Sequence, residues 1–379
     1  MHLSLTRRGG LLAVTALAAT SIAACAAPSS DNSTPAGSSG GGDAKTATSA
    51  AALGGMDKLV EAAKKEGALN VIALPPDWAN YKEILDGFAA KYPEIKITSD
   101  QPDASSADEI TTADRLKGQA TAPDVFDLGT AVALANTAKF APYKVAAWDK
   151  IPADNKEATG LWVNDYAGLM TVGYDSAKVP APTSLADLMK ADYKGKVALN
   201  GDPTKAGAAF AGVQMVAIAE GGTAADPAKG IAWFKALKAA GNFLPVDPTP
   251  ATIQSGQTPV VFDWSYNQTG VIAKVPTWKL WTPDNAALKV FYNQAISKDA
   301  PHPAAARLFQ EYLYSADGQN AWLRGGATPV LMDVMTADGT IDAKAAAALP
   351  KVTSPVLPTA EDTDKAKAAL ATAWPAAMG

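Results

Sequence analysis

Residues 66–98, EGALNVIALPPDWANYKEILDGFAAKYPEIKIT, decide the fold class of this chain. Residues 69–74 are a short apolar run closed by two prolines, which predicts a buried strand. The apolar side chains that follow recur at i, i+3, i+4 and i+7, as on one face of a helix: Tyr81, Ile84, Leu85 and Phe88. A second strand is predicted around residues 95–98. Strand, helix and strand in this order indicate an α/β protein with a mostly parallel sheet.

The same alternation continues along the chain. Further apolar runs predict strands at residues 125–128, 197–199, 259–262 and 290–296. Helical spacing predicts helices that include residues 114–118, 208–219 and 231–237, and one that begins at Pro303. No repeat of solenoid period is present, so a globular α/β body is expected from residue 56 onward.

The first 24 residues have the pattern of an export signal. Arg7 and Arg8 precede an apolar run over residues 11–23, which is well short of the ~20 residues that span a membrane. The run ends in Ile-Ala-Ala-Cys, which resembles the bacterial lipobox, so Cys25, the single cysteine of the chain, is expected to be acylated. The paired arginines also resemble a twin-arginine signal, so both export routes stay open. Residues 25–55, rich in Ser, Gly and Thr, are expected to form a flexible tether.

Composition excludes several classes of protein. The chain has 379 residues, 33 of them basic and 38 acidic, with no basic block, so nucleic acid is not an expected partner. One cysteine and two histidines exclude thiolate zinc sites, iron–sulfur clusters and internal disulfides. We expect a monomer with no cofactor and no metal site.

Several stretches resemble one protein family in content and in order. They are EGALNV (66–71), PTSLADL (182–188), YKGKV (193–197), DPT (202–204), APHPAAARLF (300–309) and SADGQ (315–319). With these stretches the chain resembles the extracellular solute-binding lipoproteins of ABC importers, in the group that binds ferric iron, polyamines or aminoethylphosphonate.

The resemblance implies a two-lobed periplasmic-binding-protein-like fold of type II, with crossover strands and a ligand cleft between the lobes. Lobe one would comprise residues 56–165 and 290–335, lobe two residues 166–289, and residues 336–379 would form a helical tail. The resemblance also implies a lipid-anchored protein on the outer face of the cytoplasmic membrane that delivers a small ligand to an ABC permease.

Acids beside aromatic residues are the candidate ligand groups. Open α/β sheets bind ligands at the loops beyond the carboxyl ends of strands. Such loops here pair an acid with a ring, which can hold an organic cation by a ring face and a carboxylate. The candidates are Asp77, Trp78, Tyr81, Asp165, Tyr166, Asp263, Trp264 and Tyr266. We expect Trp78 and Trp264 to sandwich a polyamine-like ligand whose nitrogen pairs with the aspartates. The structural alternative makes Asp77 a helix N-cap and the rings packing residues.

Two other ligand classes stay open. In ferric relatives adjacent tyrosines coordinate iron, and this chain has no Tyr-Tyr pair. In polyamine relatives the acid follows the tryptophan, whereas Asp263 precedes Trp264 here. Thr204, Lys205 and Gly207 lie where a helix is predicted to begin, and free N–H groups there could bind a phosphonate or a zwitterion.

The chain carries little that indicates an enzyme. His302 is the only histidine after the predicted signal, and no Gly-x-Ser-x-Gly elbow between a strand and a helix accompanies it. We expect this histidine to cap a helix or to face solvent in a tight turn. The function expected is therefore binding, and the alternative of another class is a secreted hydrolase that uses two carboxylates.

Overall fold

The computed structural model describes residues 42–379, and all structural statements below concern this part of the chain. The predicted export signal, Cys25 and residues 25–41 of the predicted tether lie outside the described residues. Within residues 42–379 there is no helix whose length and apolar character would let it cross a membrane.

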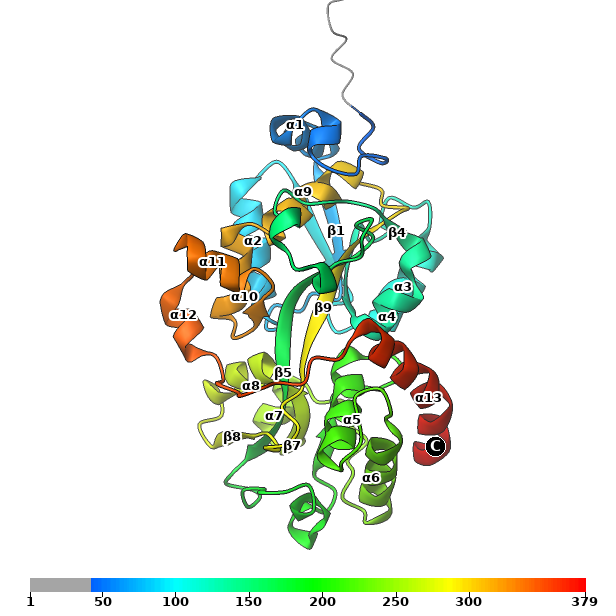
Figure 1. The fold of residues 1–379 in the computed structure, drawn as a ribbon, viewed down its shortest axis with the longest axis vertical. Helices are drawn as coiled ribbons and strands as arrows, with labels where there is room; N and C mark the ends of the chain where they lie inside the picture. The colour runs from blue at the N-terminus through cyan, green and yellow to red at the C-terminus, as the bar shows by residue number, and fades with distance from the viewer. Residues whose placement is uncertain (1–41) are drawn as a thin grey trace, which may run out of the picture. The chain divides into compact units, whose positions relative to one another are not determined.

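Two long strands, β5 (Val163–Asp175) and β9 (Lys289–Ser297), run through the body at the centre of its main sheet (Figure 1). The first part of β5 pairs with β9, and its second part pairs with β7 and β8. The order of the main sheet is β3-β9-β5-β7-β6, with β4 on β9 and with β8 and β10 on β5. These strands are β3 (Val125–Gly129), β4 (Phe140–Ala141), β6 (Val197–Leu199), β7 (Val260–Trp264), β8 (Trp278–Trp281) and β10 (Thr328–Pro329). A separate pair holds β1 (Ala68–Ile72) and β2 (Lys96–Asp100).

The prediction of a mostly parallel sheet is wrong. Among the strands of residues 42–379, β1–β2 and β6–β7 pair in parallel, whereas β5 and β9 pair antiparallel with every neighbour. The chain crosses from one half of the body to the other along β5 and returns along β9, so these strands run in opposite directions (Figure 1). The periodicity of the sequence shows that strands alternate with helices, but it does not show which half of the body a strand enters or in which direction it runs.

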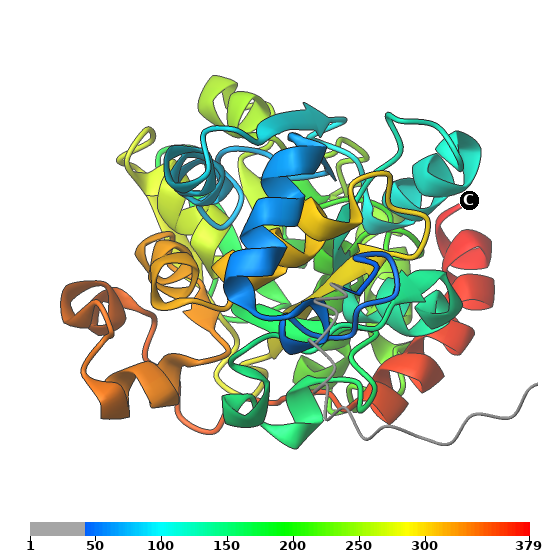
Figure 2. The same cartoon turned by 90° about the horizontal axis from the view of Figure 1, so that it is seen from above.

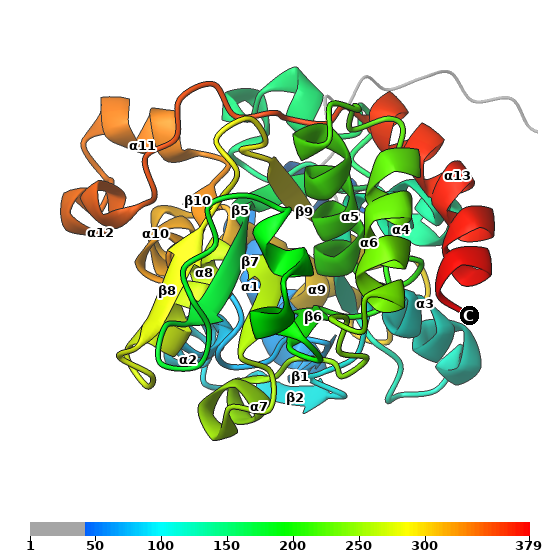
Figure 3. The same cartoon turned by 90° about the horizontal axis from the view of Figure 1, so that it is seen from below.

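The helices form two groups around β5 and β9. The upper half comprises β1 to β4 with α1 (Met56–Glu66), α2 (Tyr81–Lys91), α3 (Ser106–Leu116), α4 (Thr130–Ala135), α9 (Pro303–Leu313), α10 (Ala316–Arg324), α11 (Met332–Asp338) and α12 (Ala343–Ala348). The lower half comprises β6 to β8 with α5 (Gly207–Ala219), α6 (Ala228–Ala239), α7 (Pro250–Ser255) and α8 (Ser265–Ile272). The last helix, α13 (Ala360–Met378), packs against α4 of the upper half and α6 of the lower half (Figure 3).

Local sequence signals explain where several elements begin and end. Gly67 ends α1 in the left-handed conformation, with φ of 67°, which glycine adopts without strain. Helix α2 buries Tyr81, Ile84 and Phe88, three of the four residues whose spacing predicted it. The helix predicted to include residues 114–118 ends earlier, at Leu116.

Residues 43–55 are packed on the body, although their composition predicted a tether. Ala47 and Leu53 are buried, and residues 51–53 form a short 3₁₀ helix. The Arg307 guanidinium donates from Nε to the Ala47 carbonyl at 2.8 Å and from Nη2 to the Lys45 carbonyl at 3.1 Å. The body therefore begins near Asp43 rather than at Met56, because the buried Arg307 of α9 attaches this segment to the body through its carbonyl groups.

Two carboxylates attach the start of α9 to the rest of the upper half. Glu66, at the end of α1, accepts the N–H groups of Ala304 at 3.0 Å and Ala305 at 2.8 Å, and α1 lies over α9 in Figure 2. The buried Asp124 accepts the His302 N–H at 2.7 Å, contacts His302 Nδ1 at 2.9 Å and accepts the Asn70 N–H at 2.7 Å. His302 therefore stands at the N-cap position of α9 but pairs with Asp124 instead of capping the helix with its side chain.

Replacing His302 with Gln should remove a pH-dependent part of the stability. The hydrogen bond to the Asp124 carboxylate raises the pKa of His302 above its usual value. Because the folded state holds this proton more tightly, the stabilisation is complete below the unfolded pKa of about 6.5 and is lost as the pH rises through the folded pKa. We expect the wild-type advantage in the free energy of unfolding to be larger at about pH 5.5 than at about pH 9, by on the order of 1 kcal/mol. Urea unfolding at both pH values measures it, and an equal advantage at both would contradict the prediction.

Candidate functional site

A cleft of about 610 Å³ lies between the upper and lower halves. The upper half contributes the loop after β1, with Asp77 and Trp78, residues 102–109 around the start of α3, and Asp127 of β3. The lower half contributes residues 200–208 after β6, the start of α7, Asp263 of β7 and Asn267 of α8. Most of these segments follow strands, as expected for ligand sites of α/β folds.

Aromatic side chains from four elements meet beside this cleft. Trp78 Nε1 donates to the Tyr166 hydroxyl at 2.7 Å. The Trp78 ring lies edge-on to Tyr266 and Tyr292, with centroid distances of 5.5 and 5.6 Å. Tyr166 stacks on Tyr292 at 5.7 Å with an interplanar angle of 3°. Tyr292 of β9 lines the cleft together with Trp78 and was missed by the sequence analysis.

Trp264 does not face Trp78 across the cleft, so the predicted sandwich of these two rings is absent. Trp264 is buried, lies stacked near Tyr266 at 6.3 Å, and donates from Nε1 to the Tyr292 hydroxyl at 3.3 Å. Gly168 of β5 makes this packing possible, since a Cβ there would lie 2.6 Å from Tyr266 and 2.8 Å from Trp264. Tyr266 is also buried, and its hydroxyl has no hydrogen-bond partner among the described residues.

The three predicted aspartates occupy different environments. Asp77 is exposed at the rim and pairs with Lys274 of the lower half at 3.2 Å; it does not cap α2, whose N-cap is Asn80. Asp165 is fully buried outside the cleft lining. Asp263 is buried and lines the cleft, where its Oδ1 accepts the Trp264 N–H at 2.7 Å. Burial raises the pKa of Asp263 to about 6, and its hydrogen bonds oppose that rise.

Asp127 is the cleft residue that sequence reasoning missed most clearly. It sits in β3 between Phe126 and Leu128, and its Oδ2 accepts hydrogen bonds from the Tyr81 hydroxyl at 2.8 Å and the Tyr166 hydroxyl at 2.7 Å. Tyr81 and Tyr166, both predicted ligand residues, are buried and therefore position this carboxylate. A lone acid inside an apolar strand was the available signal, because a charge is rarely buried without a purpose.

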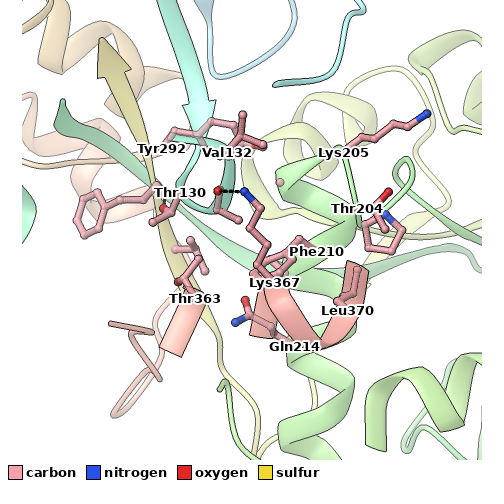
Figure 4. Close-up of a pocket in the computed structure, with 18 of the residues that line it drawn as sticks. Thr130, Val132, Thr204, Lys205, Phe210, Gln214, Tyr292, Thr363, Lys367 and Leu370 are labelled. Carbon is pink, nitrogen blue, oxygen red and sulfur yellow. Dashed lines mark hydrogen bonds between the residues drawn. The ribbon is translucent and has the colours of Figure 1, made fainter. Parts of the chain in front are cut away.

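The predicted anion loop uses part of its hydrogen-bonding capacity internally. Asp202 Oδ1 accepts both the N–H and the hydroxyl of Thr204 at 2.8 Å. Lys205 and Gly207 both line the cleft, and Gly207 also lies close to Gly129 of the upper half. Thr204, Lys205 and Gly207 also line a second cavity of about 60 Å³, shown in Figure 4, where Lys367 of α13 donates to the Ala131 carbonyl at 2.6 Å. An acid already occupies the Thr204 donors, so the loop is a weaker anion site than its sequence indicated.

His302 and Asp124 are not among the lining residues of the cleft, and residues 42–379 hold no group of three His, Cys, Asp or Glu side chains arranged to bind a metal ion.

Comparison with known proteins gives one family and many related folds. The family model described as bacterial extracellular solute-binding protein matches residues 121–358. No curated protein matches the chain significantly.

Three solved structures illustrate the likeness in fold. AgtB from A. tumefaciens R10, in complex with agropinic acid, is 17% identical with a TM-score of 0.62, and the match covers 81% of this chain and 98% of AgtB. Iron-bound HitA from Pseudomonas aeruginosa is 18% identical with a TM-score of 0.56, over 82% of this chain and 99% of HitA. AfuA from Actinobacillus pleuropneumoniae, with fructose-6-phosphate bound, is 15% identical with a TM-score of 0.60, over 82% of this chain and 97% of AfuA. These likenesses confirm the predicted two-lobed α/β fold of the periplasmic-binding-protein type.

Proposed function

Because this chain belongs to the bacterial extracellular solute-binding protein family, we propose that it captures a small organic cation of the polyamine type for an ABC importer. The ligand would bind in the cleft between the upper and lower halves, where Asp263 and the ring faces of Trp78 and Tyr292 are within its reach. The chain would act as a monomeric receptor, not as an enzyme, and pass its ligand to the permease.

The charge of the cleft lining carries this proposal. Eight acidic side chains and two lysines line the cleft, and neither arginine nor histidine is among the described lining residues. The acids are Asp77, Asp103, Asp108, Glu109, Asp127, Asp202, Asp247 and Asp263, and the lysines are Lys205 and Lys274. Such a lining attracts a cation and repels a phosphate, for which proteins usually provide arginine, lysine or free N–H groups.

The aromatic residues of the cleft fit the same ligand class. A ring face attracts an ammonium group by about 0.5 to 2 kcal/mol and also packs on the methylene groups next to it. Trp78 and Tyr292 line the cleft, next to acids from both halves. A polyamine, which alternates methylene chains with ammonium groups, can use both kinds of contact at once.

Capture would involve movement of the two halves about β5 and β9. Asp77 and Lys274 already join the halves at the mouth of the cleft. A ligand that contacts both halves stabilises the closed arrangement by the difference between its affinities for the closed and open forms.

Export and anchoring complete the proposal. We expect the chain to be exported, acylated at Cys25 and held on the outer face of the cytoplasmic membrane. A receptor held there meets its ligand outside the cell and remains close to its permease.

Replacing Asp263 with Asn should weaken polyamine binding at least about tenfold, which corresponds to about 1.4 kcal/mol. The change removes the charge and keeps the shape of the side chain. Calorimetric titration of the wild type and of the variant with putrescine and spermidine measures the loss. The matched control is Asp192→Asn, an exposed aspartate outside the cleft lining, which should bind as the wild type does.

The same titrations separate the competing ligands and the enzyme alternative. Ferric citrate and 2-aminoethylphosphonate are titrated alongside the amines, and the recovered amine is checked by mass spectrometry. Tight binding of either competitor with no binding of the amines would refute the proposed ligand class, and conversion of the amine would refute a pure receptor.

A further inference from the structure

The two carboxylate oxygens of Asp127 differ in their surroundings. Its Oδ2 accepts hydrogen bonds from Tyr81 and Tyr166, whereas its Oδ1 accepts no N–H or hydroxyl group of the described residues, and the Asp127 carboxyl group lies within hydrogen-bonding reach of the Asp165 carboxyl group. The residue is 5% exposed and lines the cleft. A buried carboxylate oxygen without a donor is costly, so a proton shared with Asp165 satisfies it in the free protein, and a cation in the cleft can take the place of that proton.

Two further carboxyl groups are linked to Asp127 through hydrogen bonds. Glu109 Oε2 accepts the Asp127 N–H at 3.2 Å. Gln294 Nε2 donates both to the Tyr81 hydroxyl and to Asp165 Oδ2, each at 2.9 Å. We call Glu109, Asp127 and Asp165 the acid cluster. All three side chains are buried.

The acid cluster contains no compensating cation. Among residues 42–379, no lysine, arginine or histidine pairs with any of its three members. The titratable groups that face it from the packed elements are acids and phenols: Tyr81 (α2), Asp108 (α3), Tyr166 (β5), Asp263 (β7), Tyr266 (α8), Tyr292 (β9) and Tyr314, which follows α9.

These surroundings favour the protonated forms of the three acids. Burial raises the pKa of Glu109, Asp127 and Asp165, and the carboxyl groups of Glu109 and Asp165 are also disfavoured as anions by the nearby Asp127. A cation placed beside Asp127 would reverse this balance, because it stabilises the ionised form of the nearest carboxyl group.

We propose that Asp127 receives the positively charged nitrogen of the ligand and that the acid cluster releases about one proton when the ligand binds. This inference rests on the proposed function, because it assumes a cationic ligand. The sign of the pH dependence follows directly. Since binding favours the ionised cluster, affinity rises with pH across the range in which the free protein loses the proton, and acidification expels the ligand.

Proton release is measured by titrating the full-length protein with putrescine in PIPES, HEPES and Tris buffers at about pH 7, at which the primary amines of the ligand stay protonated. The dependence of the observed heat on the ionisation heat of the buffer gives the number of protons released. We expect about one proton for the wild type and an affinity at least about tenfold lower at about pH 5.5 than at about pH 8.

The number of protons released by variants shows whether the proton comes from the acid cluster. Asp127→Asn should abolish the release and weaken binding at least about tenfold at about pH 8. Asp165→Asn leaves Asp127 in place and should lower the number of protons released. The control Asp192→Asn should release the same number of protons as the wild type. If a cluster variant does not fold, the infrared spectrum of the wild type still gives the answer, because a protonated carboxyl band of the free protein should disappear when putrescine binds.

The outcomes distinguish this inference from the function on which it rests. Binding of putrescine without proton release, and with equal affinity at both pH values, overturns the inference and leaves the proposed function intact. Failure of every amine to bind at any pH overturns the proposed function, and this inference with it.

Discussion

A methyl group added at Gly129 should hold the two halves of the protein apart and weaken ligand capture about 10- to 100-fold. Gly129 ends β3 in the upper half and faces Gly207, the first residue of α5 in the lower half. A Cβ at Gly129 would lie 2.9 Å from the Gly207 Cα. The Gly207 atoms that this Cβ would meet, Cα and N, belong to the backbone, so no change of a side-chain rotamer relieves the clash.

The effect of this methyl group comes from the contact and not from local conformation. Gly129 has φ of −58°, which alanine adopts easily. Overpacking of this kind costs about 1 to 3 kcal/mol. Here it destabilises the arrangement in which Gly129 of the upper half contacts Gly207 of the lower half. The affinity for putrescine measures the weaker capture, and the radius of gyration from solution scattering measures the separation of the halves.

Other glycines of the chain provide the controls. A Cβ at Gly207 would lie 2.9 Å from the Tyr292 hydroxyl and 3.1 Å from the Gly129 Cα, so Gly207→Ala should increase the radius of gyration as Gly129→Ala does and should also displace the Tyr292 side chain. The double variant should show less than the sum of the two changes in radius. A Cβ at Gly270, which lies in the cleft lining, would meet no other atom within 4 Å, so Gly270→Ala should leave the radius of gyration unchanged. A Gly129→Ala variant with wild-type affinity would show that this contact does not limit capture.

Replacing Arg307 with Met should lower the free energy of unfolding by about 3 kcal/mol. Arg307 is 1% exposed and donates to three carbonyl groups, those of Ala47, Pro303 and Lys45. A hydrogen bond from a charged donor contributes about 1.5 to 3 kcal/mol, and the change leaves buried carbonyl groups without a partner. Methionine keeps much of the packing volume, so the loss reports mainly these hydrogen bonds.

Urea unfolding and limited proteolysis measure this second effect. The loss of stability should come with faster cleavage within residues 43–55, which Arg307 attaches to the body. Arg307→Lys should recover only part of the stability, because an ammonium group lacks the planar fork that reaches separate acceptors. The control is Arg324→Met, a more exposed arginine paired with Glu83 and Asp342, which should cost less than about 1 kcal/mol. Equal losses for Arg307→Met and Arg324→Met would contradict the prediction.

Part of the candidate site was accessible from sequence because its residues follow strands. The loop after β1 and the end of β7 were found in this way, and both contribute residues to the cleft. Three details were misplaced: the partner of Trp78, the burial of Asp165 and the position of Asp77 at the rim. The first two depend on packing around β5 and β9, and in the case of Trp264 on the absence of a side chain at Gly168. The third depends on the contact of Asp77 with Lys274 of the lower half.

The order of residues was enough to predict the α/β class, most helices and strands, and the family, because each of these depends on local spacing or on short contiguous motifs. Strand direction and the ligand site were decided by contacts between distant residues. Tyr166 is 39 positions from Asp127, Trp78 is 88 positions from Tyr166, and Tyr81 is 213 positions from Gln294, yet each pair is joined by a hydrogen bond. Spacing along the chain says nothing about such pairs, since the crossing of β5 and β9 between the halves brings them together. For the same reason the acid cluster could not be predicted from the sequence, because its three members come from α3, β3 and β5 and only the fold brings them together.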